Sequence, residues 1–271
     1  MAAKAGSSVP DIASFVGVLV GFGGIIGGLL LEGGEIQDIA QYTAAIIVLG
    51  GTFGAVLIAT PLPVMLGAAG KLMAVFFDKA VTPDATIEEI IGYATKARKN
   101  GIVSLENDAQ SIADPFLRKA LNLAVDGTDL QELRKMMELE IMLEEQHSEA
   151  QAKVFEAAGG FSPTIGIIGA VMGLIQVMKN LDNIEEVGHG IAVAFVATVY
   201  GVGLANLLLL PAANKIKARA HKQILLKELV LEGVVGIVEG LNPKLIRSKL
   251  EAYAGEGGKE SSKGGNGGRK K

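Results

Sequence analysis

Three polar side chains within the long apolar stretches of this 271-residue sequence could carry chemistry. Ser162 could act as a nucleophile, His189 could move protons, and the hydroxyl of Thr198 could line an ion path. For a lone threonine, a hydrogen bond to the preceding helical turn is the more common role. His189 lies only two residues inside its apolar stretch, which favours an interfacial histidine over a proton relay.

Charged side chains are absent from the apolar stretches, which run over residues 12–31, 39–70, 157–178 and 187–214. Proton and sodium pathways usually need an ionisable group at membrane depth, where such groups are rare and functional. If this chain serves an ion pathway, we therefore expect a partner protein to supply the carboxylate.

A charged group that could be functional lies in a polar segment between these stretches. Arg98 and Lys99 come shortly before Glu106, and Gly101 indicates a turn between two helices. Such charges usually belong to a solvated surface. The alternative is a patch that meets a charged partner, where charges steer and align the contact.

The apolar stretches are long enough for four transmembrane helices, because crossing a bilayer takes about 20 apolar residues. Core helices of water-soluble proteins rarely continue so far without a charge. The 36 glycines and the 5% aromatic content also suit close helix packing in lipid. The first stretch is too long for a signal-peptide core, so we expect it to be retained. The predicted fold class is an all-α integral membrane protein.

The distribution of lysine and arginine predicts the orientation. Residues 32–38 contain no basic residue and residues 179–186 contain one, whereas basic residues are frequent in residues 71–156 and after Asn214. The positive-inside rule places both termini and residues 71–156 in the cytoplasm. The two short connections then face outward.

The predicted organisation has five parts. They are a first transmembrane helix pair (1–70), a cytoplasmic helical domain (71–156), a second transmembrane pair (157–214), a cytoplasmic C-terminal helical extension (215–254) and a disordered tail (255–271). The tail is rich in glycine and lysine, a composition typical of disorder. The helix of the last span is expected to continue to about Glu239.

Three helix starts are predicted in the cytoplasmic domain from capping patterns, and no alternating strand pattern is evident. The patterns are Thr86 with Glu89, Asp114 with Pro115, and Thr128 with Gln131. The core-facing residues of the first and third helices are expected to be Ile87, Ile90, Ile91 and Ala94, then Leu133, Met137, Ile141 and Leu143.

Small residues form a stripe on each transmembrane helix, which allows helix backbones to approach closely. The stripes contain Gly17, Gly21, Gly24 and Gly28; Gly50 and Gly54; Gly166, Gly169, Ala170 and Gly173; and Ala194, Ala197, Gly201 and Ala205. Packing inside one subunit is one interpretation. Because all four helices carry a stripe, we favour contacts to other subunits.

Two prolines, Pro163 and Pro211, lie near the cytoplasmic ends of the third and fourth spans. Proline removes a helical hydrogen bond and bends a helix. The residues themselves leave two interpretations open, a pair of hinges at one membrane level or two helix ends.

An enzyme is not predicted, because Ser162 and His189 would lie near opposite membrane faces and no catalytic pair results. The sequence suggests no cofactor and no metal, and the absence of cysteine excludes disulfides and thiolate metal sites. The net charge of −4 does not suggest a nucleic-acid partner. A stand-alone channel or carrier is a further alternative.

Several segments resemble the MotA/PomA family of flagellar stator proteins, and the resemblance covers nearly the whole chain apart from the tail. The most specific segments are Phe161–Leu174 (FSPTIGIIGAVMGL), Thr198–Gly201 (TVYG), Leu204–Leu207 (LANL) running to Pro211, and Arg98–Gly101 (RKNG) followed by Ser104–Glu106 (SLE).

This resemblance implies a ring of five subunits in the bacterial inner membrane around two copies of a MotB-type partner. The partner would supply a membrane aspartate and a peptidoglycan-binding domain. Arg98, Lys99 and Glu106 would contact the rotor protein FliG. Pro163 and Pro211 would couple ion flow to movement.

The resemblance also places Thr198 and Ala170 along the ion pathway. Similar sodium-type members carry a threonine at the position of Ala170, so one possible oxygen ligand for a hard cation is missing. Protons are therefore favoured over sodium. The alternative function is an energiser subunit of the ExbB/TolQ type, although such relatives usually have three membrane helices and lack the Arg98 to Glu106 motif.

Overall fold

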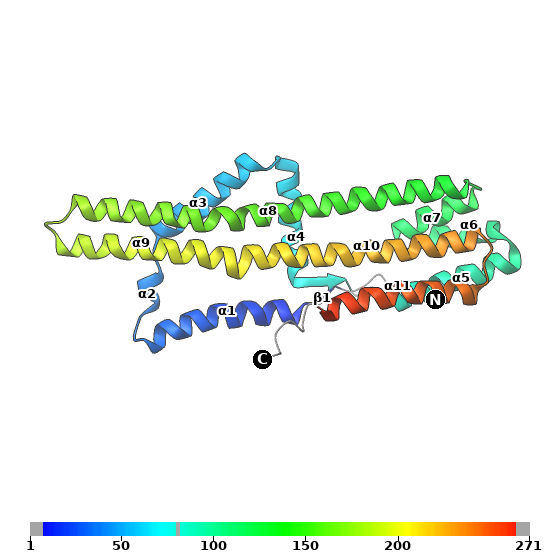
Figure 1. The fold of residues 1–271 in the computed structure, drawn as a ribbon, viewed down its shortest axis with the longest axis horizontal. Coiled ribbons are helices and arrows are strands. Elements are labelled where there is room, and N and C mark those ends of the chain that lie inside the picture. Colours follow the sequence, from blue (N-terminus) through cyan, green and yellow to red (C-terminus); the bar gives the residue numbers. More distant parts are fainter. Residues whose placement is uncertain (1–7, 80–81, 264–271) are drawn as a thin grey trace. The chain divides into compact units, whose positions relative to one another are not determined.

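A computed structural model describes residues 8–79 and 82–263, and helices dominate it (Figure 1). The helices are α1 Ile12–Leu31, α2 Ile36–Ile39, α3 Tyr42–Ala59, α4 Leu62–Phe76, α5 Pro83–Asn100, α6 Glu106–Ser111, α7 Pro115–Val125, α8 Leu130–Lys179, α9 Ile184–Leu204, α10 Leu210–Val238 and α11 Pro243–Lys263. A 3₁₀ turn (Ile102–Leu105) precedes α6, and a π-helical turn (Ala205–Leu209) joins α9 to α10. Two three-residue strands, β1 Ser8–Pro10 and β2 Phe77–Lys79, pair in one sheet that the sequence analysis did not predict.

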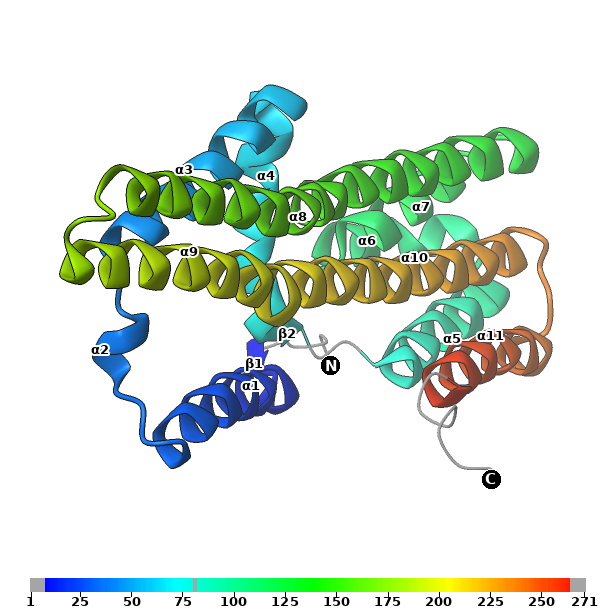
Figure 2. The same cartoon turned by 60° about the vertical axis from the view of Figure 1, so that its left-hand side comes forward.

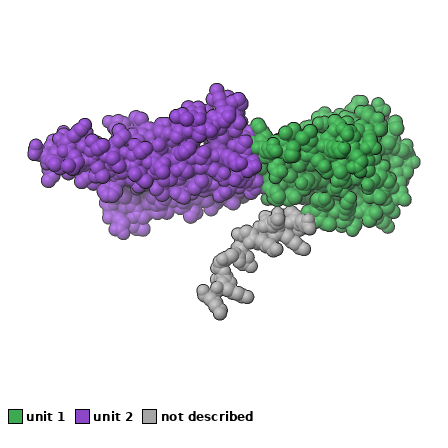
Figure 3. All heavy atoms as spheres, turned by 45° about the horizontal axis from the view of Figure 1, so that its top comes forward, with its two compact units in different colours: residues 1–9, 79–147, 219–271 green, residues 10–78, 148–218 purple. Residues whose placement is uncertain are grey.

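The chain divides into two compact units, which are coloured separately in Figure 3. Unit 1 contains residues 79–147 and 219–271 together with the first nine residues. Unit 2 contains residues 10–78 and 148–218. Most of unit 1 thus comes from the segments predicted to be cytoplasmic, and the long apolar stretches lie in unit 2.

Unit 2 contains the apolar helices. Within the described residues, four helical stretches are long and apolar enough to cross a membrane, and α1 coincides with the first predicted span. The second stretch covers 36–59 and ends at the bend before α4, where Pro61 is the N-cap residue and Pro63 lies in the first helical turn. The third and fourth stretches, Leu130–Lys179 and Ile184–Val238, extend well beyond their apolar parts.

Unit 1 has a conventional hydrophobic core, built from one face each of several helices. The predicted start at Asp114 is confirmed, since its carboxylate accepts hydrogen bonds from the backbone N–H groups of Phe116 and Leu117. Buried side chains from α5, α7, α8, α10 and α11 meet in this core. In both ribbon views α5 and α11 lie side by side (Figure 2).

Three details of the predicted helices were wrong. Thr86 is buried inside α5 and does not cap it, because the helix already begins at Pro83. Asp129 takes the capping role assigned to Thr128 by accepting from the N–H of Gln131, since its carboxylate is the stronger acceptor. Leu143 is 54% exposed, whereas the other residues expected on the two core faces are buried or half-buried.

The C-terminal end also differs from expectation in part. The fourth helical stretch ends at Val238, as predicted. The predicted disordered tail, 255–271, begins as a continuation of α11, which extends to Lys263. Extending an existing helix requires no new nucleus, which helps even glycine-rich residues to follow it. Residues 264–271 lie outside the described part.

Candidate functional site

The apolar part of α8 packs against α9 through small residues in an antiparallel hairpin. A Cβ atom added at Gly201 would lie 2.6 Å from the carbonyl oxygen of Ser162 and 3.1 Å from the Cα atom of Gly166. The hydroxyl of the buried Ser162 donates to the Gly201 carbonyl oxygen at 2.9 Å. Only glycine allows this backbone approach. Ser162 is therefore a packing residue in this structure.

The same close approach continues toward the other end of the hairpin. A Cβ atom at Gly173 would meet the carbonyl oxygen of Gly190 at 2.8 Å, and one at Gly169 would meet the Cβ atom of Ala197 at 2.8 Å. The stripes on the third and fourth spans thus serve packing inside one chain, which corrects our expectation of contacts between subunits for this pair. By contrast, added Cβ atoms at Gly50 and Gly54 on α3 would meet nothing within 4 Å.

The two residues expected along the ion pathway are both half-buried on this hairpin. The hydroxyl of Thr198 donates to the carbonyl oxygen of Ala194 at 3.2 Å, the hydrogen bond to the preceding turn that the sequence analysis weighed. The hydroxyl oxygen can still accept a hydrogen bond. From the contacts of Gly166 and Gly173, the antiparallel register places Ala170 within about one helical turn of Thr198 along the axis.

Neither proline ends the helical backbone, so the interpretation as helix ends was wrong. Pro163 lies inside α8 and is half-buried, and Pro211 is exposed in the first turn of α10. The π turn that ends at Leu209, two residues before Pro211, is a helical irregularity of the kind that often marks functional positions. A Cβ atom at Gly159 would meet the side chain of Leu210 at 2.6 Å, and Ser162 is level with Gly201, so the antiparallel register puts the two prolines about two to three turns apart along the hairpin.

The arrangement of Ser162 and His189 does not support an intramembrane enzyme. Ser162 is level with Gly201, whereas the exposed His189 is next to Gly190, which contacts Gly173. Twelve residues of helix separate the two levels, or about 18 Å at 1.5 Å per residue. A nucleophile and its base must lie within hydrogen-bond reach of each other.

The charged motif of unit 1 lies around the turn between α5 and α6. Arg98 and Lys99 are exposed in the last turn of α5, and Gly101 ends that helix with φ +83. The fully buried Leu105 anchors the following 3₁₀ turn in the core, and Glu106 is exposed in the first turn of α6. Within residues 82–263, no ion pair involves the two cations or Glu106. The motif is therefore held by its backbone and leaves these three charges in solvent.

An ion pair that the sequence analysis missed fixes this turn. The Nζ atom of Lys96 lies 2.6 Å from a carboxylate oxygen of Asp108 and so ties α5 to α6. The pair joins residues across a turn, without the three- or four-residue spacing that reveals helical pairs. One helical turn earlier, burial and a hydrogen bond donated to Glu89 raise the pKa of Tyr93.

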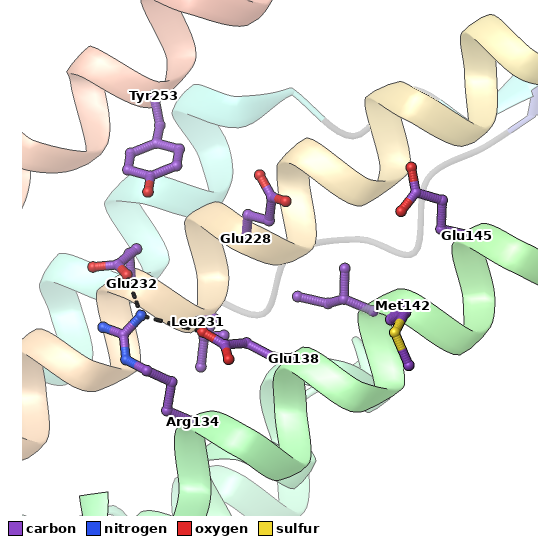
Figure 4. Close-up of a pocket in the computed structure, with 9 residues that line it drawn as sticks. Arg134, Glu138, Met142, Glu145, Glu228, Leu231, Glu232 and Tyr253 are labelled. Atoms are coloured by element: carbon purple, nitrogen blue, oxygen red, sulfur yellow. Dashed lines mark hydrogen bonds and ion pairs between the residues drawn. The ribbon is translucent and has the colours of Figure 1, made fainter. Parts of the chain in front are cut away.

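A second charged cluster in unit 1 joins α8, α10 and α11 (Figure 4). The carboxylate of Glu232 is 12% exposed and lies 2.8 Å from Arg134 and 2.5 Å from Lys249. Burial alone would raise the pKa of Glu232, but the hydrogen bonds from Lys249 and Arg134 hold it below its ordinary value. The cluster borders a hollow of about 420 Å³ with Tyr253 on its wall. These contacts stabilise the helical unit, and they were not evident from the sequence.

Within the described residues, no group of three or more His, Cys, Asp or Glu side chains is placed to hold a metal ion.

Comparison with protein families gives two matches that together cover most of the chain. The model of the MotA/TolQ/ExbB proton channel family matches residues 108–229, and the model of the motility protein A N-terminal region matches residues 15–100. Motility protein A of Bacillus subtilis (strain 168) is 34% identical over 247 residues, covering 90% of each chain. The chemotaxis protein PomA of Vibrio alginolyticus is 33% identical over 247 residues, covering 91% of this chain and 96% of its own.

Solved structures of MotAB complexes are also similar to this chain. The MotAB structure of C. jejuni matches with a TM-score of 0.86 and 30% identity, covering 90% of this chain and 95% of the matched chain. The flagellar MotAB stator complex of Bacillus subtilis matches with a TM-score of 0.83 and 34% identity, covering 89% and 95%.

Proposed function

Because this chain belongs to the MotA/TolQ/ExbB proton channel family and is a stator subunit of the flagellar motor, we propose that it forms a ring around a MotB-type partner and converts inward ion flow into torque. Five copies would surround two copies of the partner, in the inner membrane with both termini in the cytoplasm. An ExbB/TolQ-type function has no comparable support, because the similar proteins named above are motility and chemotaxis proteins.

The observation that carries this proposal is the absence of charge from the four apolar stretches, 12–31, 39–70, 157–178 and 187–214. A cation crossing the membrane needs a counter-charge at depth. These stretches offer none, so the carboxylate comes from the partner's helix. The exposed apolar side chains of α1, such as Leu19 and Leu31 at 73% and 91%, provide surface for lipid and for companion helices.

Protons are the proposed ion. The side chain of Ala170 offers no oxygen to a cation near Thr198, and a sodium ion prefers several oxygen ligands. A proton needs only the partner's carboxylate and a hydrogen-bonding path, to which the Thr198 oxygen contributes as an acceptor.

Torque is proposed to pass from the hairpin to the charged motif. Pro163 and Pro211 weaken the helical backbone at two positions about two to three turns apart, so that the hairpin can bend when the partner's carboxylate changes charge. Arg98, Lys99 and Glu106, which are exposed, then act on the rotor protein FliG.

Reconstitution in liposomes tests the counter-charge. The chain alone should conduct neither protons nor sodium, whereas the complex with its partner should conduct once activated. Ion flux through the chain alone would contradict the proposal. In cells, a protonophore should stop swimming at every sodium concentration, and a swimming speed that follows sodium instead would overturn the proton assignment.

A further inference from the structure

A small, largely apolar hollow lies beside Arg98 in unit 1, and neither the charged motif nor the ion pair between Lys96 and Asp108 accounts for it. Its volume is about 420 Å³, within the range of about 300 to 1,000 Å³ found for binding pockets. Ala94 and Ala97 of α5 and Ala124 of α7 form part of its lining. Three short side chains from two helices leave open the space that larger residues would fill.

Backbone turns form another part of this hollow, which we name the Arg98 pocket. Gly127 and Gly240, with φ values of +76 and +68, end α7 and α10 and line it. Positive φ at these glycines reverses the chain without adding side chains to this part of the lining. Val238 and Leu241 supply half-buried apolar surface.

The lining of the Arg98 pocket carries positive charge only. Arg98 is the sole charged side chain in its lining, and no carboxylate lines it. The acids nearest in sequence to the lining glycines, Asp126 and Glu239, are exposed and are not part of the lining. An occupant that fits this site combines an apolar group with a negative charge.

We propose that the Arg98 pocket receives an apolar side chain of the rotor protein, flanked there by a carboxylate that pairs with Arg98. The proposal rests on the proposed rotor contact and adds an apolar anchor to it. Two observations support it, the exposed guanidinium at the pocket and the pocket's continuity with the charged motif. A buried anchor beside a charge pair is the arrangement that concentrates binding energy in protein interfaces.

The first test makes the pocket polar at nearly constant volume. Val238→Thr adds a hydroxyl to the pocket wall, and Val103→Thr is the matched control, since Val103 is 64% exposed on the neighbouring turn and does not line the pocket. We expect Val238→Thr to weaken crosslinking of the assembled stator to the rotor protein by about fivefold and to slow swimming. The control should match the wild type.

The second test fills the pocket. Ala97→Met places a flexible side chain at the position of a lining alanine, and Ala85→Met is the control, because Ala85 is exposed at the other end of the same helix. Ala97→Met should reduce crosslinking and swimming, while the amount of assembled stator stays unchanged in both variants. Val238→Thr changes the polarity of the pocket and Ala97→Met changes its volume. A folding defect in one variant would therefore not decide the test, because the other variant is independent of it.

Arg98→Glu separates this proposal from the one on which it rests. If Arg98→Glu impairs swimming and an opposite charge change on the rotor protein restores it, while both pocket variants behave as their controls, the anchor is wrong and the charged contact remains. If Arg98→Glu has no effect, the rotor contact at this position is wrong, and a defect in Val238→Thr would then indicate a different occupant. Loss of crosslinking in all three, with intact controls, is the expected result.

Discussion

The two units bury opposite kinds of side chain. In unit 1, large residues such as Leu117, Leu121 and Met137 fill the core, and charged side chains lie around it. In the α8–α9 hairpin of unit 2, glycine and alanine lie inside, and large residues such as Ile167 and Phe195 are 57% and 68% exposed. Unit 1 is organised for water, where burying large apolar side chains drives folding. The hairpin is organised for lipid, where close backbone packing and hydrogen bonds hold helices together.

The largest effect is expected where the hairpin backbones touch. Gly201→Ala would place a Cβ atom 2.6 Å from the carbonyl oxygen of Ser162, and this contact involves backbone that cannot rotate away. We expect a destabilisation of about 1 to 3 kcal/mol and a clear loss of assembled complex. The measurement is the yield and melting temperature of the purified complex. Gly188→Ala is the control, because nothing lies within 4 Å of that site and alanine favours helix. A complex of unchanged melting temperature would show that the glycine approach is not required.

The next largest effect is expected on swimming, without an effect on assembly of the complex. Pro163→Leu restores an N–H group that can donate to the carbonyl oxygen of Gly159, which stiffens the helix where we propose a hinge. We expect normal yield of the complex but loss of swimming. Pro115→Ala is the control, since Pro115 occupies the first turn of α7, where an N–H group has no helical partner. Preserved swimming in Pro163→Leu would remove the hinge from the mechanism.

The sequence predicted the apolar helices well and the contacts between them poorly. The start and end of α1 follow directly from the limits of a charge-free stretch, which is a local property. The use of Gly166 and Gly201 inside one chain could not be predicted, because a small stripe does not reveal which helix it will meet. The hydrogen bond from the Tyr200 hydroxyl to the Ile39 carbonyl oxygen likewise joins residues far apart in the sequence.

The sequence identified the charged residues of the candidate site but not the contacts and the pocket around them. Arg98 and Glu106 were identified from residue types and from family resemblance, and the structure places both in solvent. The ion pair between Lys96 and Asp108 and the Arg98 pocket depend on how three turns come together. No local spacing encodes that arrangement.

A smaller effect is expected in unit 1, at Glu232. Its pKa lies below the ordinary value, so the contribution to stability is fully present above the pKa of an unfolded glutamate and is lost as pH falls through the lower folded value. Glu232→Gln should cost about 1 kcal/mol at neutral pH, since solvent partly screens the cluster. It should also remove part of the acid sensitivity below about pH 4. Hydrogen exchange of α10 and α11 in the intact complex, followed against pH, measures both. An unchanged acid profile in Glu232→Gln would assign that sensitivity to other carboxylates.

The smallest effects on stability are expected for two lysines of unit 1, one in an exposed ion pair and one that also contacts an aromatic ring. Lys119 pairs with Glu140 on the surface, whereas Lys227 pairs with Glu144 and also lies 4.8 Å from the centre of the Phe116 ring. Lys119→Met should change stability by less than about 1 kcal/mol, and high salt should abolish the difference. Lys227→Met should have the larger effect, because it also loses the contact with the ring, which salt screens less. Hydrogen exchange of α7 and α8 at low and high salt tests the order. Equal effects would mean that neither the lower exposure of Lys227 nor its contact with the ring adds to the ion pair.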